Sequence, residues 1–231
     1  MPSADSCPDS TTSACCATRT AILDAAEALF AKHGVDGTSI RQITQEAGVN
    51  LAAVNYHFRT KAHLALEVYA RCLRPLNAQR MALLDEAERE AAGAPVPLER
   101  VLEALIRPVI QDRVSGNGHE IAFILLMGRS FQEQGAEVSQ LVSRQFADIV
   151  KRFDEAILRA VPGLTPEDLT WRLHFLIGSL HHSLDIWARY EEHPVRSIRA
   201  VRYPKPDCAS FARRLIDFVA AGLRAPSTLS S

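Results

Sequence analysis

Apolar residues recur along this chain at intervals of three and four positions, from Ile22 and Ala26 near its start to Leu215 and Phe218 near its end. No segment alternates apolar and polar residues as a half-buried strand would. A period near 3.6 residues is typical of amphipathic helices. We therefore predict an all-α protein, with helices at about 20–33, 40–47, 51–57, 60–91, 98–111, 119–134, 137–160, 166–190 and 207–223 and a bend at Pro75, which has no amide hydrogen.

The segment 34–61 is the most informative part of this pattern, because it predicts two short helices around a glycine turn. Ser39 and Gln42 have the spacing of a capping box for the first, and Gly48 ends it. Asn50 is placed to cap the second. Such a helix-turn-helix, followed by aromatic and basic residues at 55–61, is typical of a protein that meets the DNA backbone.

Composition narrows the function classes. A formal net charge of -1 argues against coating nucleic acid through bulk charge, but it leaves site-specific binding open. The longest apolar run, 121–127, is too short to cross a bilayer. Residues 1–18 lack the basic and apolar regions of a secretory signal, so we expect a disordered leader and a cytoplasmic protein. Three of the five cysteines lie in that leader and no CxxC pair occurs, so neither a disulfide framework nor a zinc site is predicted.

The residues 20–66 resemble the TetR family of bacterial transcriptional regulators. The resemblance rests on AlaAlaGluAlaLeuPhe at 25–30, HisGlyValAspGlyThrSerIleArgGlnIle at 33–43, AlaGlyVal at 47–49 and TyrHisPhe-x-x-Lys at 56–61. Thr44 and Asn55 depart from the usual family residues. Segments 48–58, 115–118 and 171–178 further resemble the PsrA-type subgroup, whose members respond to long-chain fatty acids.

We predict four regions, of which the resemblance implies the two middle domains. They are a disordered leader at 1–18, a helix-turn-helix domain at 19–64, a ligand-binding and dimerisation domain at 65–225, and a disordered tail at 226–231. The family's phosphate contacts fall on Tyr56, His57 and Lys61, and their hydroxyl, imidazole and ammonium groups all donate hydrogen bonds to phosphate.

The third predicted helix is placed to enter the major groove with its N-terminus first. Its small residues either read thymine methyl groups and adenine or only permit close approach, with DNA shape supplying the selectivity. The predicted DNA-contacting residues are Thr38, Ser39, Arg41, Leu51, Ala52, Ala53, Asn55, Tyr56, His57 and Lys61.

The family places an effector among the helices between 98 and 190 and a dimer contact on the last two helices. Each effector candidate is also explained as ordinary core, and Arg129 or His174 is a candidate for binding a carboxylate. The effector candidates are Phe123, Met127, Arg129, Phe131, Phe146, Ile149, Phe153, His174 and Phe175. The dimer candidates are Gly178, Ser179, His182, Phe211, Leu215, Phe218 and Gly222, with Phe175 also on that face.

His174, His181 and Asp185 share one helix face at a spacing that could ligate a metal, but such residues more often form a polar patch or a subunit interface. We expect no metal and no cofactor. The sequence shows no Ser/His/Asp or Cys/His spacing, no glycine-rich phosphate loop and no HExxH, so we do not expect an enzyme.

We therefore expect a homodimeric repressor that a hydrophobic effector, such as a long-chain fatty acid or acyl-CoA, releases from a palindromic operator. One alternative is a regulator of an efflux system that responds to a xenobiotic or aromatic compound. A helical lipid-binding protein or enzyme would explain the apolar C-terminal half but not the helix-turn-helix.

Overall fold

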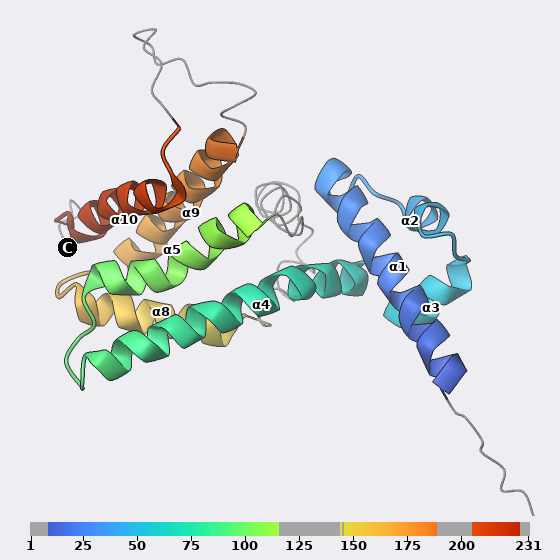
Figure 1. Cartoon of the computed structure of the whole chain (residues 1–231), viewed down its shortest axis with the longest axis horizontal. Coiled ribbons are helices and arrows are strands. Elements are labelled where there is room, and N and C mark those ends of the chain that lie inside the picture. Colours follow the sequence, from blue (N-terminus) through green and yellow to red (C-terminus); the bar gives the residue numbers. More distant parts are fainter. Residues whose placement is uncertain (1–8, 116–143, 145, 189–204, 227–231) are drawn as a thin grey trace, which may run out of the picture. The chain divides into compact units, whose positions relative to one another are not determined.

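The computed structural model describes residues 9–115, 144, 146–188 and 205–226, and every regular element among them is α-helical (Figure 1). This confirms the predicted all-α fold class. The contacts between Cα atoms divide the chain into two compact units. Unit 1 comprises 1–72 with 121–145, and unit 2 comprises 73–120 with 146–231.

Unit 1 contains three complete helices and the beginning of a fourth. These are α1 (Asp9–His33), α2 (Ile40–Glu46), α3 (Leu51–Phe58) and the first residues of α4 (Lys61–Glu90). Helix α1 contacts both α2 and α3, and α2 contacts α3. Side chains from all four helices form its core, namely Ile22, Ala26, Phe30, Ile43, Val54, Phe58, Leu64 and Val68.

Helix α1 begins at Asp9, about ten residues before the predicted start, so the expected leader at 1–18 is helical over its second half. The apolar pattern missed this because residues 9–18 carry no inward-facing stripe. Once Ile22 and Phe30 anchor the helix in the core, each added residue gains a backbone hydrogen bond without a new nucleation step.

Ion pairs join α1 to the first turns of α4. Arg19 lies 2.8 Å from Glu67, and its guanidinium stands over the ring of Phe58 at 5.3 Å from the centroid. Arg71 bonds to Asp24 at 2.6 Å and to the buried carboxylate of Glu27. These contacts fix the direction in which α4 leaves the helix-turn-helix within unit 1.

Helix α4 is a single element although it contains Pro75. The division between the two units falls between Cys72 and Leu73, two residues before this proline. Because Pro75 has no amide hydrogen, the carbonyl of Arg71 loses its helical partner. One continuous helix therefore supplies residues to both units.

Unit 2 contains the rest of α4 with α5 (Leu98–Ser115), α8 (Ala147–Ala160), α9 (Pro166–Ala188) and α10 (Cys208–Arg224). Helix α5 contacts both α8 and α10, so it is the central element. Within the predicted helix at 137–160, α8 begins at Ala147 with Phe146 as its N-cap, and residues 137–143 lie outside the described residues, as does the predicted helix at 119–134.

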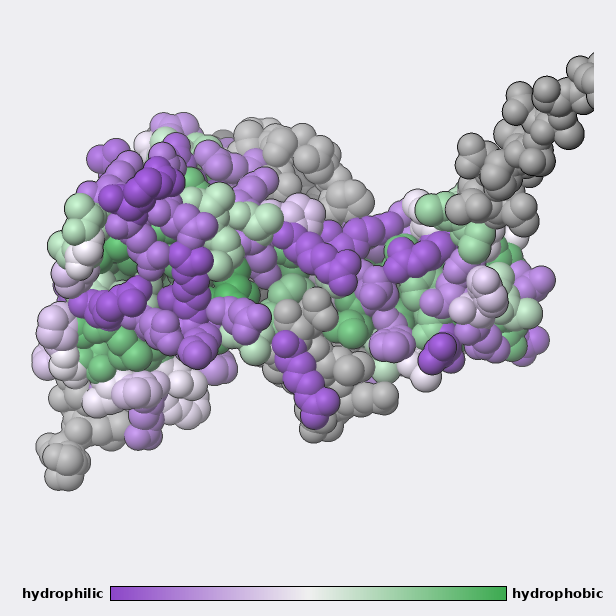
Figure 2. Space-filling model, turned by 90° about the horizontal axis from the view of Figure 1, so that it is seen from below, coloured by the Kyte–Doolittle hydropathy of each residue, from purple (hydrophilic) through white to green (hydrophobic). Residues whose placement is uncertain are grey.

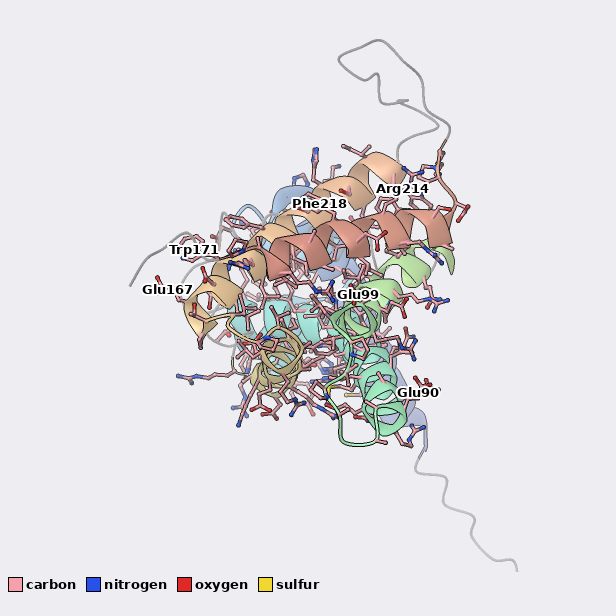
Figure 3. All side chains as sticks on the ribbon, turned by 90° about the vertical axis from the view of Figure 1, so that its left-hand side faces the viewer. Glu90, Glu99, Glu167, Trp171, Arg214 and Phe218 are labelled. Atoms are coloured by element: carbon pink, nitrogen blue, oxygen red, sulfur yellow. The ribbon has the colours of Figure 1, made fainter. Side chains whose placement is uncertain are left out.

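Helices α9 and α10 pack side by side and run antiparallel (Figures 1 and 3). At one end Arg172 donates to the carbonyls of Leu223 and Ala225, both at 2.7 Å, where the last carbonyls of α10 have no helical partner. At the other end the rings of Trp187 and Phe211 stack with centroids 5.6 Å apart.

The side of unit 2 on which α4 and α8 lie is hydrophilic over much of its area (Figure 2). Arg152 of α8 bonds to Asp85 and, at 2.7 Å, to Glu88 of α4, and Arg159 reaches Glu88 at 3.1 Å. None of the described helices is both long enough and apolar enough to cross a membrane.

Candidate nucleic-acid interface

Side-chain caps fix both short helices of the helix-turn-helix. The Gln42 amide donates to Ser39 Oγ at 3.2 Å, and the Ser39 amide donates to Gln42 Oε1 at 2.8 Å, which confirms the predicted capping box. Gly48 takes a φ of 66° after α2, a value that favours glycine. Asn50 Oδ1 then accepts from the Ala53 amide at 2.9 Å and begins α3 as predicted.

Helix α3 presents the outer face that the sequence predicted. Val54 and Phe58 point into the core, while Leu51, Ala52 and Asn55 are exposed and Ala53 is half-buried. Helix α3 contains no Asp, Glu, Lys or Arg, so its outer face can contact bases but attracts phosphate weakly.

The predicted phosphate contacts surround the end of α3. Tyr56 is 77% exposed, and its ring meets the half-buried His57 edge-on. Lys61 Nζ lies 3.4 Å from the carbonyl of Asp36, which ties the start of α4 to the loop before α2. Arg41 is exposed on α2. Donors from three helices thus lie on the outside of unit 1.

Thr38 is placed differently from the prediction. It is only 1% exposed, and its hydroxyl donates to the carbonyl of Gly34 at 2.8 Å. A hydroxyl held in the core cannot reach a phosphate, so Thr38 is corrected from a DNA contact to a residue that braces the turn between α1 and α2. Ser39 remains exposed, with its Oγ engaged in the cap.

Arg59 forms a strained turn that the sequence did not predict. Its φ and ψ are 61° and −53°, and the amide of Thr60 donates to the carbonyl of Phe58 at 2.6 Å. These are the features of a three-residue γ-turn with positive φ, a rare conformation for a residue with a Cβ atom. A glycine would have signalled this turn, and the sequence has arginine there. The Arg59 side chain is exposed in this turn, three residues after Tyr56 and two before Lys61.

The structure describes five of the nine effector candidates. Phe123, Met127, Arg129 and Phe131 lie outside the described residues. Of those on α8 and its N-cap, Phe153 is buried, whereas Phe146 and Ile149 are half-buried.

His174 and Phe175 do not line the interior of unit 2. His174 is exposed, with Nδ1 2.7 Å from the carbonyl of Thr170, and Phe175 is 66% exposed. Both side chains are exposed on α9, and their assignment to the effector site stays a prediction.

The dimer candidates divide into two groups. Gly178, His182, Phe218 and Gly222 are exposed and Ser179 is half-buried. Leu215 is buried within the subunit, so it is corrected to an intrachain contact. Phe211 is half-buried with its ring stacked on Trp187, and its place in the dimer contact stays a prediction. Trp171, which the sequence reasoning missed, is 59% exposed one helical turn before Phe175. In the described residues no group of three His, Cys, Asp or Glu could hold a metal ion.

Loss of a phosphate donor is expected to weaken DNA binding regardless of sequence. Tyr56→Phe removes one hydrogen-bond donor and Lys61→Gln removes one positive charge, and each change should reduce affinity for promoter DNA and for unrelated DNA alike. For Lys61→Gln, the slope of log affinity against log salt should fall by about 0.9. Fluorescence anisotropy across a salt series measures the affinity and its salt dependence. Lys151→Gln is the control, because Lys151 is an exposed lysine on α8. Unchanged affinity at low salt would remove these two residues from the interface.

The Arg59→Gly substitution distinguishes the effect of backbone strain on stability from the effect of the Arg59 charge on DNA binding. Glycine adopts positive φ without the Cβ clash, so the free energy of unfolding should rise by about 1 kcal/mol. The same change removes an exposed cation, so DNA affinity should fall. Chemical unfolding and DNA titration of one preparation measure the two effects. A destabilised variant would show that the turn is not strained.

Comparisons with known proteins agree with this geometry. Residues 22–68 match the family model described as bacterial regulatory proteins of the tetR family. Residues 103–222, about half of the chain, match the model described as the tetracyclin repressor-like C-terminal domain. The two matches together cover the helix-turn-helix and most of the remaining helices.

Individual proteins give the same result. The chain is 27% identical over 174 residues to the HTH-type transcriptional regulator AcrR of Shigella flexneri, covering 74% of this chain and 78% of that protein. The crystal structure of NalD from Pseudomonas aeruginosa is 26% identical, with a TM-score of 0.55 over 89% of this chain and 95% of that one. A TetR-family structure from Shewanella sp. PV-4 has the same TM-score at 18% identity, covering 87% of this chain and 95% of that one, and supports the fold alone.

Both halves of the chain thus match the family, and its N-terminal unit carries the family's helix-turn-helix with α3 exposed. The chain belongs to the TetR family and is a DNA-binding transcriptional regulator, not an enzyme.

Proposed function

We propose that this regulator is a homodimeric repressor that binds a palindromic operator in the cytoplasm and is released by a hydrophobic effector. The observation that carries the proposal is an aromatic outer face on α9 and α10. Trp171 and Phe175 of α9 and Phe218 of α10 are 59%, 66% and 67% exposed. Figure 3 shows Trp171 and Phe218 on these adjacent helices.

This aromatic face differs from the α4 and α8 side of unit 2, where charged side chains form ion pairs. A cluster of exposed aromatic residues is typical of a surface that another molecule covers. Two copies related by a twofold axis would bury six of these rings. At about 1.5–3 kcal/mol for each fully buried side chain, that is on the order of 10 kcal/mol before the cost of association.

Two glycines on the same face support a second copy as the partner. Gly178 and Gly222 lie inside helices, where glycine costs about 1 kcal/mol relative to alanine. A Cβ atom added at either position would meet nothing within 4 Å in the single chain. Packing within the subunit therefore does not require glycine there. Close approach of a facing helix would require it.

The dimer would give the small reading surface of α3 its selectivity. Two α3 helices held at a fixed separation match successive major grooves, about 34 Å apart. An effector that binds better to a dimer with another separation would shift the population away from the DNA-binding state. Helix α4 suits this coupling because it supplies residues to both units.

The proposed effector is a long-chain fatty acid or acyl-CoA. The resemblance of 48–58 and 171–178 to the PsrA-type subgroup supports this class. The relative NalD favours a second candidate, because its structure is described as the secondary repressor of the MexAB-OprM multidrug efflux pump. On that reading the effector is a xenobiotic or aromatic compound.

Charge placed in the aromatic face should prevent dimerisation. We expect Phe218→Glu to be a folded monomer that binds promoter DNA at least ten-fold more weakly than the wild type, since burying an unpaired carboxylate opposes association. Analytical ultracentrifugation with circular dichroism measures assembly and folding. Val150→Glu is the matched control, because Val150 is an exposed apolar residue on α8. A dimeric Phe218→Glu protein would exclude this face.

The two effector classes are distinguished by release from DNA. We expect long-chain fatty acids or their CoA thioesters to abolish the mobility shift of a fragment upstream of the protein's own gene. Aromatic xenobiotics should have no effect at equal concentration. The reverse result would support the efflux-type regulator. A fragment that binds and is released by neither class would contradict the effector response, and no shift at all would contradict operator binding upstream of its own gene.

A further inference from the structure

Arg80 occupies a core position of α4 in unit 2. Leu76 and Leu84, four residues before and after it, are both buried. Steps of four residues return to the same face of a helix, so these three side chains form one inward stripe. The Arg80 side chain is itself half-buried. An arginine thus stands where the pattern requires an apolar residue.

The partners of Arg80 are neutral. Its Nε donates to the carbonyl of Leu105 on α5 at 2.8 Å, and Nη1 donates to Asn77 Oδ1 at 3.1 Å. These bonds use two of the five N–H groups of a guanidinium. No carboxylate pairs with Arg80 within the part of the chain that the structure describes. Loss of hydration accordingly lowers the pKa of Arg80 to about 10, without an opposing charge.

Several other arginines of unit 2 are paired with carboxylates. Carboxylates hold Arg152 and Arg224 of unit 2, and their hydrogen bonds raise the pKa of both. Arg100 bonds to Glu90 at 2.7 Å. Among the half-buried arginines in the described part of unit 2, Arg152 and Arg172 each have a carboxylate within 4 Å and Arg80 has none, so Arg80 is a candidate position for accepting an anion.

Packing explains only one of the Arg80 bonds. Helix α5 contains Pro108, whose ring crowds the preceding turn and whose missing amide leaves the Ala104 carbonyl without a helical partner. The Nε bond to the neighbouring carbonyl of Leu105 stabilises α5 beside this proline. A glutamine amide could donate to the same carbonyl, so the bond does not account for the positive charge.

We propose that Arg80 binds the carboxylate of an amphiphilic acid that acts as the effector. This inference deepens the proposed function and rests on it. A guanidinium binds a carboxylate through two parallel N–H bonds, and the apolar side chains of α4 and α5 suit a hydrocarbon tail. One cation matches one negative charge, which favours a carboxylate over a doubly charged phosphate ester. Arg80 takes the role that the sequence assigned to Arg129 or His174.

The test compares an acid with its uncharged analogue. Dodecanoate and dodecan-1-ol share a twelve-carbon chain, and isothermal titration of the full-length protein measures both affinities. We expect the wild type to bind dodecanoate at least ten-fold more tightly than the alcohol. Arg80→Gln should lower the acid affinity ten-fold or more, leave the alcohol affinity unchanged and bring the ratio near one. Arg80→Lys, which keeps the charge, should retain part of the preference.

Arg74→Gln is the matched control, because Arg74 is an exposed arginine on the same helix and its loss should leave the ratio unchanged. A merely structural role of Arg80 would change stability but not the acid-to-alcohol ratio. A wild type that binds both probes equally, or neither, would overturn the proposal even if Arg80→Gln fails to fold. So would an Arg80→Gln protein that keeps the preference.

Release of promoter DNA is measured with the same two probes. Selective acid binding through Arg80 without release would leave the Arg80 site standing and contradict the effector response. Release by a compound without a carboxylate, with no dodecanoate binding, would keep the effector response and overturn the Arg80 site. The two proposals therefore fail in distinguishable ways.

Discussion

The ion pair between Arg71 and the buried Glu27 is the contact on which the arrangement of unit 1 depends. Glu27 is 6% exposed, and Arg71 Nε is buried without a hydrogen-bond partner in the structure. Removing Arg71 would leave the buried Glu27 carboxylate without this cation, and loss of one partner of a buried ion pair typically costs about 3–5 kcal/mol. Asp24 supplies a second carboxylate at 2.6 Å. Helix α1 therefore has one strongly favoured position on the first turns of α4. Because α2 and α3 pack on α1, the direction of α3 relative to these turns follows from the same contact.

The fixed position of α3 matters because its outer face carries little charge. Helix α3 is only eight residues long and offers small or polar side chains, so a single copy can distinguish few base pairs. Its position on α4 is nevertheless well defined. In the proposed dimer, contacts through α9 and α10 would hold two α3 helices at a fixed separation. That separation would supply the selectivity that the side chains of α3 lack.

The local features of the helix-turn-helix could be predicted from sequence because neighbouring residues determine them. The Ser39 capping box and the Asn50 cap each depend on residues no more than three positions apart. Features outside these capping patterns were missed. The hydroxyl of Thr38 turns toward Gly34, Phe211 stacks on Trp187, and Arg59 is held in a turn for which it has no intrinsic preference. In each case a partner or a chain direction set elsewhere decides the outcome.

Arg80 and Asp154 are ionisable residues of unit 2 whose burial without a charge partner opposes folding. Burial raises the pKa of Asp154 on α8 with no partner that lowers it, just as it lowers the pKa of Arg80. An apolar residue at either position would remove this penalty. Pro75 and Pro108 add to the cost, since each removes a backbone hydrogen bond inside a helix. Packing alone would favour leucine or alanine at these four sites. Groups without a charge partner suit a unit that responds to an effector. The ligand can supply the missing partner, and its binding then stabilises the state in which the group is paired.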